Sequence, residues 1–176
     1  MKALLCWFLL TCTALAQWPA AQAPVVPAAD GYVAIPNAAL APDKGHSYRA
    51  IFYATHAAEK PAQLVPALNM AGSELNALAV AHVPLKEAKF VLVFHGPAVN
   101  GLLDNGHYKV KFGVDNPNLK TIAKMKQQGT EFYVCGQYLA GEKIDLKTLT
   151  PDVTVAADAL LVLIRYQNNG YSLLSF

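Results

Sequence analysis

The sequence predicts one α/β domain, a three-layer sandwich with a mostly parallel sheet between layers of helices. Segments with strand character alternate with helical segments, as in right-handed βαβ crossovers. Residues 90–94 form an unbroken apolar run, which is typical of a strand covered by helices on both faces. The length of 176 residues indicates a single domain.

A strand and a helix are expected first. Residues 49–54 are predicted to form the first strand. The helix is expected to begin between Pro61 and Pro66, and Pro66 must lie in its first turn or mark a kink. Pro84 ends this run. One face of the helix carries apolar side chains at spacings of three and four, namely those of Leu64, Leu68, Ala71, Leu75 and Leu78.

The second strand, residues 89–94, ends at the turn signal His95-Gly96-Pro97. Residues 98–103 are expected to form a short helix. Residues 104–114 are interpreted as a loop because glycines and an Asn-Gly pair interrupt them.

The next helix has clear end signals. Asn116 is suited to cap it, Pro117 to its first position and Gly129 to its exit. The remaining expected elements are a strand at 130–135, a short helix or turn at 136–141, a helical turn at 145–149, a strand at 153–155, a helix at 158–167 and a strand at 171–176.

The N-terminus has the pattern of a signal peptide, assigned to residues 1–16. Lys2 precedes the apolar residues 3–10, and Ala14-Leu15-Ala16 forms a small-x-small cleavage site. The apolar run is about half the ~20 residues that cross a bilayer, which disfavours a membrane span. Cys12 raises a lipoprotein alternative, although Thr11 fits it poorly. We expect an exported protein, periplasmic or secreted, cleaved after Ala16.

Residues 17–47 form an irregular leader rich in proline and alanine, and the α/β domain is assigned to residues 48–176. A flexible leader and one that docks on a neighbouring subunit both remain open. The apolar residues Trp18, Tyr32, Val33 and Ile35 favour docking.

Composition and motifs disfavour several functions. The formal net charge is +2 with dispersed Lys and Arg, so we expect no nucleic-acid partner. The five histidines show no metal-ligand spacing. Residues 96–101 have the glycine spacing of a phosphate loop, but Leu102 and Leu103 replace the required Lys and Ser/Thr. We expect no metal and no cofactor.

Cleavage of the signal peptide would leave Cys135 as the only cysteine, so no intramolecular disulfide can form. In an oxidising compartment a lone cysteine is buried and inert, pairs between chains, or is a reactive thiol. Cys135 ends a predicted parallel strand just before a short helix, and helix starts favour the nucleophilic thiolate.

Ligands of open α/β sheets bind at the carboxyl ends of the strands. Two predicted strands end at His95 and Cys135, which would share one edge if these strands are neighbours. Gly136 would allow close approach of a substrate, and Gln137 and Tyr138 would donate hydrogen bonds. The candidate site therefore comprises Cys135 as catalytic residue, with His95, Gly96, Asn100, Gly136, Gln137 and Tyr138 as pocket residues.

An ordered set of motifs resembles the DsrE/DsrF family, most closely its YchN-like, signal-bearing members. The resemblance covers residues 48–176 and is carried by the set rather than by any one motif. The motifs are Phe90-Val91-Leu92-Val93-Phe94-His95-Gly96-Pro97-Ala98, Asn116-Pro117-Asn118-Leu119, Lys126-Gln127-Gln128-Gly129, Phe132-Tyr133-Val134-Cys135-Gly136-Gln137 and Asn169-Gly170-Tyr171.

The resemblance implies a three-layer α/β fold that assembles into homotrimers or homohexamers. It also implies that Cys135 carries sulfane sulfur as a persulfide, exchanged with a donor or acceptor protein, with His95 in the same pocket. The leading hypothesis is thus a sulfur carrier, sulfurtransferase-like if active. The alternatives are a non-enzymatic oligomeric protein that binds a small ligand or serves assembly, and a chain that pairs through a Cys135 disulfide.

Overall fold

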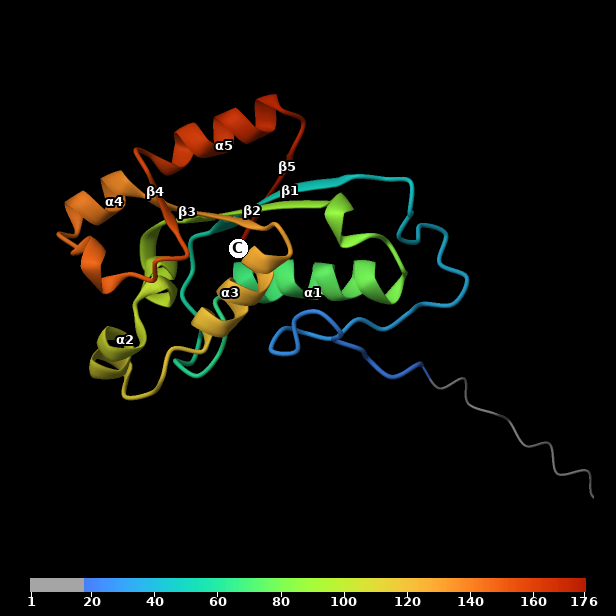
Figure 1. The fold of residues 1–176 in the computed structure, drawn as a ribbon, viewed down its shortest axis with the longest axis horizontal. Helices are drawn as coiled ribbons and strands as arrows, with labels where there is room; N and C mark the ends of the chain where they lie inside the picture. Colours follow the sequence, from blue (N-terminus) through green and yellow to red (C-terminus); the bar gives the residue numbers. More distant parts are fainter. Residues whose placement is uncertain (1–17) are drawn as a thin grey trace, which may run out of the picture.

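The computed structural model describes residues 18–176 and confirms the three-layer α/β prediction (Figure 1). Five parallel strands form a sheet in the order β4-β3-β2-β1-β5. Helices α1 (Pro66–Val80) and α3 (Asn118–Gln127) cover one face of this sheet, and α5 (Ala159–Asn168) lies over the other (Figure 1). The predicted signal peptide lies outside the described residues. The strands are β1 (Tyr48–Ala54), β2 (Ala88–Phe94), β3 (Glu131–Cys135), β4 (Thr154–Ala156) and β5 (Ser172–Ser175).

The helix predicted to begin at Pro117 begins one residue later, at Asn118, with Pro117 in the cap position. Otherwise the helices fall near the predicted positions, with one further correction. They are α1 (Pro66–Val80), α2 (Asn105–Phe112), α3 (Asn118–Gln127), α4 (Gly136–Gly141) and α5 (Ala159–Asn168), with short 3₁₀ turns η1 (Leu85–Glu87), η2 (Gly96–Leu102) and η3 (Leu146–Thr148). The prediction of a loop over residues 104–114 was wrong, because this segment contains α2. Its Asp104 caps the helix by accepting from the His107 N–H, and Gly113 ends it with φ +78°.

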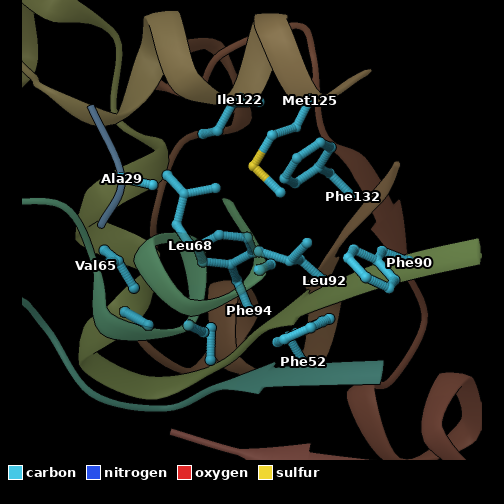
Figure 2. Packing of buried hydrophobic residues seen from close by; sticks show 14 of the residues in the cluster. Ala29, Phe52, Val65, Leu68, Phe90, Leu92, Phe94, Ile122, Met125 and Phe132 are labelled. Atoms are coloured by element: carbon cyan, nitrogen blue, oxygen red, sulfur yellow. The ribbon is translucent and has the colours of Figure 1, made fainter. Parts of the chain in front are cut away.

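Alternate residues of the strands face opposite helix layers. On the α1 face, Phe52, Leu92 and Phe94 pack with Phe132 beneath Leu68, Ile122 and Met125 (Figure 2). On the α5 face, Ile51, Val91 and Val93 pack with Cys135 against Ala159, Val162 and Leu163. The second cluster is smaller, so the α5 side is the thinner cover of the sheet.

The leader packs against α1 of its own chain. Val25, Val26 and Ala29 are buried, and Gln22 and Tyr32 pair across a short antiparallel bridge. A Cβ at Gly72 would lie 2.7 Å from the Ala29 Cβ, so the absence of a side chain at Gly72 allows this close approach. The leader is therefore packed on the outer face of α1.

Asn76 holds the leader from the middle of α1. Its Oδ1 accepts from the N–H groups of Val25 and Val26 at 3.0 and 2.8 Å, and its Nδ2 donates to the carbonyls of Val26 and Asp30. The Asn76 side chain is fully buried. The Asn76 side chain therefore satisfies backbone N–H and C=O groups of the leader that have no strand or helix partner.

Two buried asparagines explain the Asn116-Pro117-Asn118 motif. Asn116 Nδ2 donates to the carbonyls of Gly101 and Leu103, and its Oδ1 accepts from the Asn118 N–H at 2.9 Å. Asn118 Oδ1 accepts from the Val65 N–H at 2.9 Å. Together they join the turn after β2, the start of α1 and the start of α3.

The Asn76→Ala variant is expected to lower the free energy of unfolding by at least about 2 kcal/mol, because two buried N–H groups lose their acceptor. Urea unfolding measures this loss. Asn168→Ala, an exposed position on α5, is the control and is expected to change stability by less than about 0.5 kcal/mol. Equal effects of the two variants would contradict the role given to Asn76.

Candidate functional site

His95 and Cys135 end adjacent strands. Phe94 of β2 pairs with Val134 of β3, so the residues that follow lie side by side at the carboxyl edge of the sheet. Parallel neighbours are about 4.8 Å apart. By alternation both side chains belong to the α5 face, His95 with Val93 and Cys135 with Tyr133. The register therefore brings the two main candidates of the sequence into one place.

The sulfur of Cys135 lies at the start of α5. Its Sγ accepts a hydrogen bond from the Ala159 N–H at 3.3 Å, while Asp158 caps the helix by accepting from the Leu160 N–H at 2.6 Å. A helix N-terminus stabilises negative charge on its acceptor. The neighbouring Asp158 carboxylate opposes that effect.

The same sulfur is shielded from solvent. Cys135 is 2% exposed and packs in the apolar cluster below α5. The first turn of α5 lies over the thiol and excludes solvent from it. Any reaction at Cys135 requires this cover to move.

Gly136 has a packing role. A Cβ at this position would lie 2.6 Å from the Ala156 carbonyl oxygen, so the glycine allows β4 to pair closely with β3. We expected a substrate to use this space, but the backbone of the neighbouring strand fills it. The helix α4 that follows has only six residues, and the sulfur bonds to α5 instead.

His95 carries an unused nitrogen. Its Nδ1 is buried and has no hydrogen-bond partner among residues 18–176. The imidazole lies near two tyrosine rings, with centroid distances of 5.1 Å to Tyr138 and 6.2 Å to Tyr53. A buried nitrogen without a partner loses solvation without compensation, so Nδ1 is available to a group that enters beside Cys135.

Sequence reasoning missed Tyr53, Asp158 and Ala159. The pKa of Tyr53 is raised, first by burial and then by the charges of Cys135 and Asp158, which places its phenol near both groups. Two patterns in the sequence could have identified Tyr53 and Asp158. Tyr53 lies two residues after Ile51 on β1 and therefore on the same face of the sheet. Asp158 has the residue type and position of a helix cap.

The remaining candidates differ in their positions. Gln137 Nε2 donates to the Ala157 carbonyl at 3.4 Å, beside the start of α5. Gly96 is buried with φ +59°. Asn100 is directed elsewhere, because its Oδ1 accepts from Lys111 Nζ at 2.7 Å. It lines a separate small cavity of about 40 Å³ with Tyr108 and Phe112.

The DsrE/DsrF-like family model matches residues 47–176, which is most of the chain and includes every strand of the sheet. The chain belongs to the DsrE/DsrF-like family. The match supports the resemblance derived from the motifs, and its start coincides with the first strand. No curated protein matches the chain.

Two solved structures are similar to this DsrE/DsrF-like chain. One is the protein of unknown function MTH1491 from Methanobacterium thermoautotrophicum, with a TM-score of 0.54 and 19% identity over 73% of this chain and 99% of that one. The other is the ychN protein from E. coli, with a TM-score of 0.54 and 17% identity over the same shares. At these identities the likeness supports the fold.

The described part of this DsrE/DsrF-like chain contains no group of three His, Cys, Asp or Glu side chains arranged to hold a metal. Likewise, no helix within residues 18–176 is long and apolar enough to cross a membrane.

A polar network lies on the same face as Cys135, nearer the start of β3. Glu131 Oε2 accepts from the hydroxyls of Tyr133 and Tyr166 at 2.9 and 2.8 Å. The pKa of Tyr166 is raised well above its ordinary value, first by burial and then by hydrogen bonds with Tyr133 and Glu131. Folding therefore favours the protonated phenol of Tyr166.

The free energy of unfolding is expected to fall as pH rises above about 10, because Tyr166 keeps its proton when folded and loses it when unfolded. Because folding raises the pKa of Tyr166, the stabilisation from its protonated phenol is fully present below the pKa of the unfolded state and declines above it. The slope is at most about 1.4 kcal/mol per pH unit for one proton. Urea unfolding across this range is expected to show a smaller slope for Tyr166→Phe. An unchanged slope would contradict the network.

Proposed function

We propose that this protein is a sulfur carrier that acts through the thiol of Cys135. Membership of the DsrE/DsrF-like family is consistent with a sulfur-relay role. The observation that carries the proposal is the bond from the Ala159 N–H to the Cys135 sulfur, at the carboxyl edge of a parallel sheet and next to His95. This geometry directs the N–H group at the start of α5 toward the sulfur, in the place where such sheets bind ligands.

The transfer step balances without an external oxidant. The Cys135 thiolate attacks the outer sulfur of a donor persulfide, R–S–SH. The donor S–S bond breaks, R–S⁻ leaves, and Cys135 becomes Cys–S–SH with the donor's proton. In the next step an acceptor thiolate takes the outer sulfur and returns Cys135 to its thiolate. His95 Nδ1, which has no hydrogen-bond partner among residues 18–176, can form a hydrogen bond with a group that enters beside Cys135.

Access to the sulfur is the condition for this function. Because Cys135 is 2% exposed, the reactive state is a minor conformation in which the first turn of α5, or Tyr138, has moved. The α5 face has fewer buried residues than the α1 face. Local opening of a thin layer costs less free energy than global unfolding.

Alkylation of the folded protein with iodoacetamide, followed by peptide mapping, is expected to label Cys135 at a measurable rate that is lower than in urea. Tyr138→Ala is expected to increase the rate in the folded state by about tenfold, which corresponds to a fall of ~1.4 kcal/mol in the opening free energy. Tyr32→Ala, a tyrosine of the leader on the other side of the sheet, is the matched control.

The same protein is then incubated with a persulfide donor, and a gain of one sulfur atom at Cys135 is expected by mass spectrometry. A Cys135 that resists both reagents while folded, yet reacts when unfolded, would overturn the sulfur-carrier proposal and leave the second candidate.

The second candidate is a non-enzymatic oligomeric protein that binds a small ligand or serves assembly. Leu160, Leu161 and Ile164 on the outer side of α5 are each more than half exposed. Neighbouring apolar residues of this kind are typical of protein contacts. A separate groove of about 270 Å³ between α1 and β5, floored by Phe52, Phe90 and Phe176, offers space for an apolar ligand.

We propose that the chain self-associates through the outer side of α5, and that it is exported with loss of residues 1–16. Sedimentation of Leu160→Glu and Ile164→Glu is expected to give smaller species than the unchanged chain, because each variant buries a charge in the contact. Val110→Glu, at an exposed apolar position on α2, is the control. A monomeric unchanged chain at micromolar concentration would contradict self-association.

A further inference from the structure

A polar cavity lies beside the covered thiol, between α5 and the β3–β4 edge of the sheet. Its volume is about 340 Å³. The polar residues that line it are Glu131, Tyr133, Asp158, Arg165 and Tyr166. This volume suits a small molecule rather than a protein segment.

The cavity presents both signs of charge. Glu131 receives both tyrosine hydroxyls on Oε2, which leaves Oε1 for another donor. Arg165 forms no ion pair with any residue in the range 18–176. A molecule with an ammonium and a carboxylate would therefore find a partner for each.

The geometry connects this cavity to Cys135. On β3 the side chains of Glu131, Tyr133 and Cys135 share one face by alternation, and Cys135 pairs with Ala156, which also lines the cavity. Asp158 lines it as well and precedes Ala159, whose N–H bonds the sulfur. The thiol thus lies next to the end of the cavity formed by the start of α5.

The spacing along α5 separates Arg165 from the sulfur. Arg165 follows Asp158 by seven residues, or about 10 Å of helix rise. The small side chains of Ala156 and Ala157 lie at the Asp158 end of the cavity. A ligand whose charged groups lie at Arg165 and Glu131 would direct its remaining end toward the covered thiol.

We propose that this cavity binds a small zwitterionic thiol compound, of amino-acid to short-peptide size, and presents its sulfur to Cys135. The proposal rests on the sulfur-carrier function and names its substrate class. The ligand's carboxylate pairs with Arg165, its ammonium with Glu131, and its sulfur lies at the Asp158 end. In the persulfide form it donates its outer sulfur to the Cys135 thiolate and leaves as a thiolate.

Binding is tested apart from reaction in the full chain carrying Cys135→Ser. The probes are S-methylcysteine and S-methylglutathione, which are zwitterionic and unreactive, and the neutral probe is the methyl ester of N-acetyl-S-methylcysteine. In ¹H–¹⁵N spectra, shifts are expected at Tyr133, Asp158 and Arg165 with a zwitterionic probe only. Arg165→Gln is expected to weaken binding by about threefold, the range for an exposed ion pair. Lys120→Gln, an exposed change on α3, is the control.

Reaction is tested in the unchanged chain by the rate of mixed-disulfide formation at Cys135. Cystine and glutathione disulfide are compared with the neutral hydroxyethyl disulfide, and each rate is divided by that of a free model thiol. We expect the unchanged chain to react faster with a zwitterionic disulfide than with the neutral one. In Arg165→Gln this preference is expected to fall, while the rate with the neutral disulfide stays unchanged. Comparing the rates with cystine and with glutathione disulfide distinguishes an amino-acid ligand from a short-peptide ligand.

The outcomes separate the two proposals. Equal binding and equal relative rates for neutral and zwitterionic compounds would overturn the ligand class and leave the sulfur carrier intact. Selective binding without any reaction at Cys135 would overturn the sulfur carrier and retain the cavity as a binding site. An absence of binding by every probe would overturn the ligand assignment.

Discussion

The bond between the Ala159 N–H and the Cys135 sulfur joins the sheet to the helix that covers it. This contact has two opposite consequences. The N–H group at the helix start donates a hydrogen bond to the sulfur, and the same turn excludes solvent, leaving Cys135 2% exposed. Reactivity and protection therefore depend on one element, α5, and any motion of its first turn changes both together.

The two faces of the sheet differ in the size of the apolar core that covers them. The α1 face carries the larger core, and the leader adds a further layer fastened by the buried side chain of Asn76 (Figures 1 and 2). The α5 face has a smaller core and exposes Leu160, Leu161 and Ile164. Stability is concentrated on one side, which leaves the thinner side available for contacts and local opening.

Much of the fold was predictable because its signals are local. The apolar run of residues 90–94 and the proline at the start of α1 marked their elements, and their alternation gave the parallel sheet. Helix α2 was missed because glycine and an Asn-Gly pair outweighed the capping signal of Asp104. The docking of the leader was left open because the acceptor, Asn76, lies fifty residues beyond Val26.

The sequence by itself determined the fold class, the family and the pair of residues, His95 and Cys135, that ends two parallel strands. These features depend on residue type, order and alternation, which are read along the chain. Only the tertiary structure decided that β2 and β3 are neighbours, that the sulfur bonds α5 rather than α4, and that it is covered. Burial and pairing depend on residues distant in sequence, and local patterns carry no information about which distant segment fills a given space.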